Sequence, residues 1–87
     1  MAEVFYVSPY NKITGKDSEL IAGRTLYDIC ENIQCKYPEF DSLIVNGKLT
    51  RALVVLVDRR GALTLEGLDT PIEDTTEIMF MKYLGWA

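Results

Sequence analysis

The sequence predicts an α+β fold in which one mixed β-sheet covers a single helix. Segments rich in β-branched and aromatic residues stand at both ends, around residues 3–7 and 77–82. One amphipathic helical pattern lies between residues 25 and 37, and the second half carries strand-like runs without a helical stripe. With 87 residues, 48% hydrophobic and 25% charged, the chain has room for one domain with one modest core.

The first element expected is a strand over residues 3–7, which ends at Ser8-Pro9. Pro9 to Gly15 is predicted to be a turn region, and residues 18–22 a second strand that Gly23 ends. A hairpin is the economical pairing of these strands. The loop of about ten residues is longer than a tight turn, so turn chemistry does not set the register.

The helix is predicted to begin after Thr25, an N-cap residue, with Asp28 placed favourably near its N-terminus. It must stop before Pro38. Spacings of three and four residues give one apolar stripe, formed by Leu26, Ile29, Cys30, Ile33 and Tyr37. Cys30 is therefore expected in the core and Cys35 at the periphery. Two cysteines are too few for a disulfide scaffold.

The second half is expected to be rich in strands. Asn46-Gly47 is a turn signal after residues 43–45, and residues 51–58 form a strand that is apolar on both faces and therefore central in its sheet. Residues 58–61 are predicted to turn that strand into a returning strand over 62–65, as a second hairpin.

The chain then bends toward its last strand. Residues 67–72 are expected to form a bend whose Leu68 and Ile72 cap the core, and residues 73–76 turn into the final strand. The continuous apolar run from Ile78 to Met81 predicts burial on both faces in the middle of the sheet. We place the domain at residues 1–84 and a C-terminal tail at residues 85–87.

The element order leaves few topologies. If the first two strands form a hairpin and the helix crosses back over it, the commonest arrangement places the first and last strands side by side and parallel. This is a β-grasp, or ubiquitin-like, fold with a mixed four- to five-stranded sheet wrapped on one helix. A ferredoxin-like sandwich is the alternative, but it requires a second helix.

Composition excludes several classes of function. The net charge of −4 comes without a basic stripe, which argues against nucleic-acid binding. The apolar run at residues 52–57 is too short to span a bilayer, so a cytoplasmic protein with no membrane association is expected. Histidine is absent, and no phosphate loop or nucleophile motif is present, so we expect no enzyme and no catalytic residue. The acidic residues follow no calcium-loop spacing, and no metal site is expected; they are Glu66, Asp69, Glu73, Asp74 and Glu77.

Two phrases resemble the MoaD and ThiS family of small sulfur carriers. The first is GRTLYDICENIQCKYPEF, with the family's glycine, threonine, helix and Tyr-Pro sequence. The second is VVLVDRRGALTLEGLDTPIEDTTEIMF, which is similar to the family's strand, turn, Gly-Leu-Asp-Thr-Pro bend, acidic turn and last strand. Together they span residues 23 to 80 in the family's order.

The resemblance implies a chemistry at the C-terminus. Carriers of this family end in Gly-Gly, whose carboxylate a partner enzyme adenylates with ATP and Mg and converts to a thiocarboxylate. It implies an adenylating, E1-like enzyme as partner, leaves open a sulfur-accepting synthase subunit, and implies no cofactor bound by the carrier itself. Gly85 would be the activated residue, with Tyr83 and Leu84 gripped by the partner.

The sequence departs from the family pattern in its tail. It ends Leu-Gly-Trp-Ala, so only Gly85 matches the Gly-Gly end, and Trp86 would enter a channel shaped for glycine. Three alternatives stay open: trimming of Trp86 and Ala87, loss of the carrier chemistry in a ubiquitin-like binding module, or docking of the tail on its own domain. Thr75-Thr76 also stands where the family has Gly-Asp, so that turn must avoid positive φ. The sulfur pathway, whether molybdopterin, tungsten cofactor, thiamine or transfer-RNA thiolation, stays open too.

Overall fold

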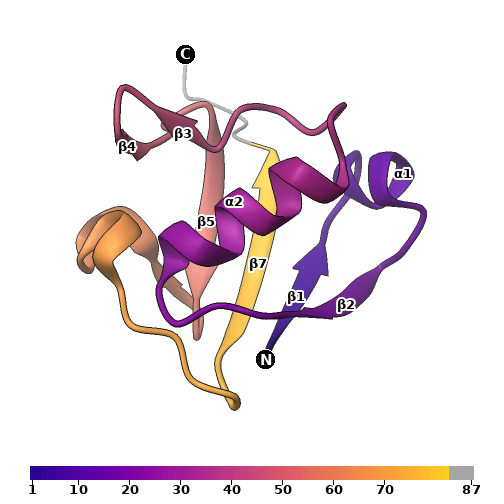
Figure 1. The fold of residues 1–87 in the computed structure, drawn as a ribbon. Helices are drawn as coiled ribbons and strands as arrows, with labels where there is room; N and C mark the ends of the chain where they lie inside the picture. The colour runs from indigo at the N-terminus through magenta and orange to yellow at the C-terminus, as the bar shows by residue number, and fades with distance from the viewer. Residues whose placement is uncertain (83–87) are drawn as a thin grey trace.

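The computed structural model describes residues 1–82, and Figure 1 shows one sheet with a helix lying across one of its faces. The strands are β1 (Ala2–Tyr6), β2 (Ser18–Ile21), β3 (Ile44–Val45), β4 (Lys48–Leu49), β5 (Leu53–Val57), β6 (Arg60–Gly61) and β7 (Glu77–Lys82). The helices are α1 (Tyr10–Thr14) and α2 (Leu26–Lys36), with 3-10 turns η1 (Ala62–Thr64) and η2 (Gly67–Asp69).

The main sheet has five strands in the order β2-β1-β7-β5-β6. β7 lies in the centre, parallel to β1 and antiparallel to β5, so that Val4 pairs with Ile78 and Val55 with Phe80. β1 and β2 form the antiparallel hairpin that the sequence predicts. The first and last strands are side by side and parallel, as expected for a β-grasp fold, because α2 carries the chain across one face between the hairpin and β5.

The predicted helix is confirmed at both ends. The Thr25 side chain accepts a hydrogen bond from the Asp28 backbone N–H, which satisfies one of the free donors of the first turn. The helix ends at Lys36, ahead of Pro38. Cys30 is fully buried on the apolar stripe, and Cys35 is exposed, as the periodicity predicts.

The core lies between α2 and the sheet face that meets it. Alternate strand residues point into it, including Val4, Val55, Ile78 and Phe80. Tyr10 stacks on Phe40 with ring centroids 4.9 Å apart, at one end of an aromatic cluster. Leu68 and Ile72 are buried, so the bend after η1 caps the core as expected.

The turn predicted over Pro9 to Gly15 contains a short helix instead, α1. Its cause is the burial of Tyr10 and Thr14, one helical turn apart, which faces both side chains inward. The Thr14 hydroxyl donates to the Tyr10 carbonyl, and Gly15 ends the helix with φ of 75°. The α1 segment is too short to show a helical periodicity, so the sequence pattern did not predict this helix.

The second predicted hairpin is shorter than expected. β6 pairs with β5 at Arg60 and Gly61 only, and the predicted strand over residues 62–65 is wrong, because the chain turns at once into η1. The Thr64 hydroxyl donates to the Gly61 carbonyl at 2.7 Å, and Ala62 takes a core position, which together bend the backbone away from β5.

The apolar runs of β5 and β7 are each buried on one face only. The prediction that both of their faces are buried is therefore wrong. In β7, Ile78 and Phe80 are fully buried, whereas Met79 and Met81 are half-buried on the opposite face. β5 shows the same alternation. The reason is that α2 covers only one side of the sheet, so the second apolar set of each strand faces outward.

Candidate partner-binding surface

The sheet face turned away from α2 is apolar over its central strands. The strand register places the outward-facing residues of β1, β5 and β7 side by side. Met79 pairs with both Phe5 and Leu56, and Met81 pairs with Val54. Leu20 extends the surface onto β2, where it pairs with Glu3 and is 62% exposed. We call this surface the open face, defined by Phe5, Leu20, Val54, Leu56, Met79 and Met81. Contiguous apolar surface of this kind is typical of protein interaction sites.

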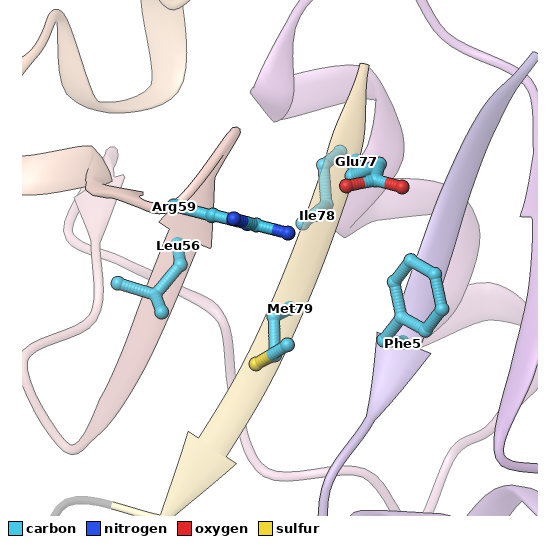
Figure 2. Close-up of a pocket in the computed structure, with 6 residues that line it drawn as sticks. All are labelled: Phe5, Leu56, Arg59, Glu77, Ile78 and Met79. Carbon is cyan, nitrogen blue, oxygen red and sulfur yellow. The ribbon is translucent and has the colours of Figure 1, made fainter. Parts of the chain in front are cut away.

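The open face contains a hollow between β1, β7 and the hairpin after β5 (Figure 2). Its apolar part comes from Phe5, Leu56 and Met79, with Arg59 and Glu77 at one end. Figure 2 shows the Arg59 side chain extending from the hairpin toward β7, on the side where Glu77 lies. An apolar floor with one cation and one anion at its rim fits a protein surface that carries apolar and charged groups together.

The hairpin geometry sets the position of Arg59. Asp58 and Arg59 both have positive φ, of 49° and 69°, the pattern of a type I′ turn joining β5 to β6. The Asp58 carboxylate accepts a hydrogen bond from the Glu77 backbone N–H at 2.9 Å and ties the turn to the start of β7. Asp58 and Arg59 both lie in the left-handed region, where side chains are disfavoured. This turn conformation holds the Arg59 side chain beside the open face.

All the site residues predicted from the sequence lie outside the described residues, in the segment 83–87 that contains the tail. They are Tyr83, Leu84, Gly85, Trp86 and Ala87, which follow Lys82 at the end of β7. Lys82 pairs with Leu53, at the opposite end of β7 from Glu77.

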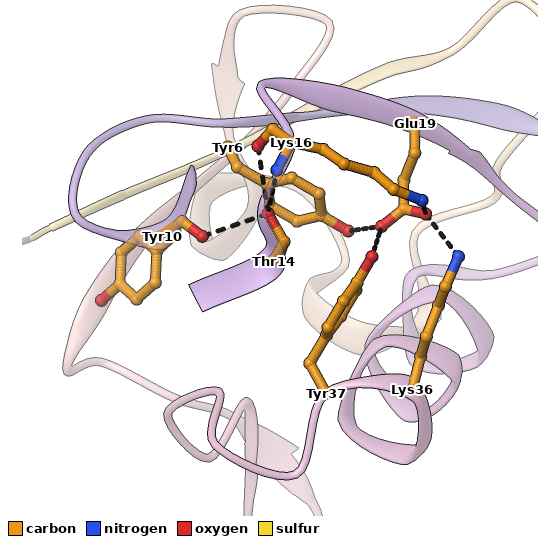
Figure 3. Close-up of polar contacts among 7 residues, drawn as sticks. All are labelled: Tyr6, Tyr10, Thr14, Lys16, Glu19, Lys36 and Tyr37. Atoms are coloured by element: carbon orange, nitrogen blue, oxygen red, sulfur yellow. Dashed lines mark hydrogen bonds and ion pairs between the residues drawn. The ribbon is translucent and has the colours of Figure 1, made fainter. Parts of the chain in front are cut away.

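A second polar cluster surrounds Glu19 on β2, whose side chain is only 7% exposed (Figure 3). Its carboxylate accepts hydrogen bonds from the Tyr6 hydroxyl at 2.8 Å and the Tyr37 hydroxyl at 2.5 Å. It also pairs with the ammonium groups of Lys36 at 2.5 Å and Lys16 at 3.2 Å. These contacts fasten β2 to the end of α2.

The electrostatics of this cluster follow from its contacts. Burial acts to raise the pKa of Glu19, but the hydrogen bonds from Lys36, Tyr37, Tyr6 and Lys16 outweigh it and lower that pKa to about 2. Burial and the Glu19 contact raise the pKa of Tyr6 above its ordinary value. Glu19 stays ionised and its oxygens are occupied, so the cluster is suited to holding the fold together.

Two further features within residues 1–82 bear on chemistry, namely the buried Cys30 thiol and the placement of possible metal ligands. Burial raises the pKa of the Cys30 thiol to about 12, so it stays protonated and unreactive. Within residues 1–82, His, Cys, Asp and Glu side chains form no group of three that could hold a metal. Over the same residues, no helix has the length and apolar character needed to cross a membrane.

Sequence reasoning missed the residues of the open face. Leu56 and Met79 lie in the apolar runs that predict strands buried on both faces, and Phe5 lies in the expected first strand, whose two faces the sequence pattern did not assign. The single amphipathic helix in the sequence could have predicted them. One helix of 11 residues can cover only one side of a five-stranded sheet, so the apolar residues on the other side must face outward.

The sheet order, the single crossing helix and the parallel central pair define the ubiquitin-like β-grasp class. No protein-family profile matches the sequence, and no curated protein matches it significantly. Solved structures do match over nearly the whole chain. Small archaeal modifier protein 1 (SAMP1) from Methanosarcina acetivorans has a TM-score of 0.85 at 19% identity, covering 99% of this chain and 95% of its own.

Two CysO structures are also similar. A chain of the BexX/CysO complex from Amycolatopsis orientalis has a TM-score of 0.84 at 18% identity, with all of both chains covered. CysO from Mycobacterium tuberculosis, described as an antigen, has a TM-score of 0.81 at 20% identity, covering 97% of this chain and 100% of its own. The neighbours are ubiquitin-like proteins of the MoaD/ThiS type, and at this identity the likeness shows the shared fold.

Proposed function

We propose that this chain is a small ubiquitin-like sulfur carrier that acts through its tail and docks on partner enzymes through the open face. The match over nearly the full length of SAMP1 and CysO supports this most, because one of these structures is a complex of CysO with BexX. Residues 83–87 follow β7 in the sequence, and β7 also carries Met79 and Met81 of the open face. One partner could therefore hold the sheet and receive the tail.

The carrier chemistry would be supplied by the partner. A tail carboxylate oxygen attacks the α-phosphorus of ATP, with Mg bound by the adenylating enzyme, and pyrophosphate leaves. A sulfide-equivalent nucleophile then displaces AMP from the acyl adenylate and leaves a thiocarboxylate. For Gly85 to carry this carboxylate, hydrolysis must first remove Trp86 and Ala87. The chain itself contributes binding and presentation of the tail.

A second candidate is a ubiquitin-like binding module that does not undergo activation. The apolar open face supports it, because partner binding through Phe5, Leu56 and Met79 needs no tail chemistry. In that case Trp86 would serve as an interface anchor, a role in which tryptophan is enriched.

The two candidates differ in the mass of the chain end. Intact protein purified from its host is measured before and after incubation with the host's adenylating enzyme, ATP, Mg and a sulfur donor. Loss of Trp86-Ala87, or exchange of one terminal oxygen for sulfur, supports the carrier. A chain that still ends at Ala87 with its mass unchanged, under conditions that activate an authentic carrier, refutes the carrier and supports the binding module.

The open face is tested separately by Met79→Lys. We expect at least about a tenfold loss of affinity for the adenylating enzyme, since a charge would be buried against the partner's apolar surface. Val45→Lys is the matched control, because Val45 is 46% exposed on the β3–β4 hairpin, away from the open face. Equal affinity of the two variants, both verified as folded, would contradict docking through this face.

A further inference from the structure

β5 has an open edge along its first half. On one side it pairs with β7 over its whole length, from Leu53 to Val57. On the other side β6 pairs with Leu56 and Val57 only, because the chain leaves the sheet at η1. Within residues 1–82, no strand therefore pairs with the outer edge of Leu53–Val55.

The register shows which backbone groups face this open edge. The Asp58 N–H donates to the Glu77 carbonyl, so alternate β5 residues, including Val54 and Leu56, direct their polar groups toward β7. Leu53 and Val55 must then direct their N–H and C=O groups outward. A row of backbone N–H and C=O groups without a partner strand is a template on which another strand can pair.

A groove runs along this edge. Its lining is apolar where Leu49, Leu53, Val55 and Ala62 are buried, and Leu63, which is 50% exposed, forms part of its wall. Arg51 also lines the groove and is exposed. None of the ion pairs found within residues 1–82 involves Arg51.

We propose that this groove, the β5-edge groove, binds an extended segment of a partner protein as an added strand. The segment would have apolar side chains at alternate positions, which suit the groove lining, and an acidic side chain that meets Arg51. Backbone hydrogen bonds to Leu53 and Val55 supply affinity, and Arg51 supplies specificity. The groove shares Val54 with the open face, but it runs along the edge of β5, whereas the open face lies over the sheet.

The charges favour a partner over a second copy of this chain. Antiparallel pairing of two copies centred on Val54 would place Arg51 of one opposite Val57 of the other. Arg60 pairs with Val57 across the β5–β6 hairpin, so Arg51 of one copy would come close to Arg60 of the other. An acidic segment from another protein avoids this repulsion.

The first measurement is amide hydrogen exchange on the free full-length protein at low concentration. Leu53 and Val55 should exchange at least about tenfold faster than Val54 and Leu56, whose N–H groups face β7. Equal protection of all four amides would mean that the edge is already occupied by the protein's own chain, and would overturn the proposal.

The second measurement identifies the ligand class. A phage-displayed library of random 12-residue peptides is selected against the full-length protein, with Arg51→Glu as the counter-target. We expect peptides that alternate apolar residues and carry Asp or Glu. A selected synthetic peptide should slow exchange at Leu53 and Val55 by about tenfold or more, while leaving Phe5 and Met79 of the open face unchanged.

Matched variants then test the charge. Arg51→Glu should weaken peptide binding by about tenfold or more, as loss of a charge-assisted contact predicts, whereas Arg51→Lys should retain part of the affinity. Arg24→Glu makes the same charge change at an exposed position before α2 and should bind as the wild type. Equal effects of Arg51→Glu and Arg24→Glu would overturn the proposal.

Three other outcomes would also overturn it. Failure to enrich any peptide would remove the strand-addition site. Peptides that slow amide hydrogen exchange only at Phe5 and Met79 would assign binding to the open face. Protection of Leu53 and Val55 that rises with protein concentration, together with dimers in sedimentation, would make a second copy the occupant.

Discussion

Replacing Glu19 by Gln should remove a large part of the stability of the domain. The side chain is nearly isosteric, so packing is kept, but the amide nitrogen donates where the carboxylate accepts from Tyr37, Tyr6 and two lysines. At least one buried donor loses its acceptor, and Lys16 and Lys36 lose their counter-charge. Unpaired buried polar groups are costly.

The magnitude follows from the pKa of Glu19, which falls from its ordinary 4.5 to about 2. At 1.36 kcal/mol for each pH unit, this difference corresponds to roughly 3 kcal/mol of stabilisation of the ionised form. Lys16 and Lys36 are about half exposed, at 47% and 48%, so solvent screening reduces their share. We therefore expect Glu19→Gln to lower the free energy of unfolding at pH 7 by about 2 kcal/mol.

The pH dependence distinguishes this mechanism from a packing defect. Because the folded pKa of Glu19 lies below the unfolded value, its contribution is present above pH 4.5 and is lost as the pH falls toward 2. Urea unfolding of both proteins between pH 7 and pH 2 should show a difference that shrinks toward zero. Glu39→Gln, at an exposed position, is the control. A constant difference down to pH 2, or a Glu19 variant as stable as the control, would refute the reasoning.

Three further predictions concern individual residues. A thiol reagent should modify exposed Cys35 in the folded protein and buried Cys30 only upon unfolding; equal rates would contradict the core assignment. Gly23→Ala should destabilise by about 1–3 kcal/mol in urea, because its Cβ would lie 2.9 Å from helix side-chain atoms, whereas Gly61→Ala, with no atom nearer than 3.8 Å, should be milder. Thr25→Ala should cost about 1 kcal/mol by loss of the N-cap, and an unchanged urea midpoint would exclude that role.

Much of the fold could be predicted because its main signals are local. Thr25 and the apolar stripe define α2, and the Asn46-Gly47 turn, with φ of 52° and 75°, joins β3 to β4. Thr75 and Thr76 avoid positive φ, as their side chains require. Topological rules supplied the parallel pairing of β1 and β7, which no local pattern contains.

The errors arose where tertiary contacts override local pattern. Tyr10 lies in a segment typical of a turn, but its packing on Phe40 selects a short helix. Ala62 and Thr64 lie in a strand-like run, but burial of one and a hydrogen bond of the other bend the chain into η1. The packing of Tyr10 on Phe40 joins segments far apart in the sequence and cannot be identified from spacing, whereas the hydrogen bond of Thr64 to Gly61 is local.

The candidate site also has one part that the sequence predicted and one part that it did not. The tail, with Gly85, was predicted from a resemblance and lies outside the described residues. The open face was present in the sequence only as apolar positions, because an alternating set such as Ile78 and Met79 does not say which member meets a helix. The number of elements that cover the sheet decides it, since within residues 1–82 one helix lies across one face and leaves the other uncovered. An apolar face left open on a sheet this small lowers solubility without adding to the core, so the open face is best explained by a partner that covers it.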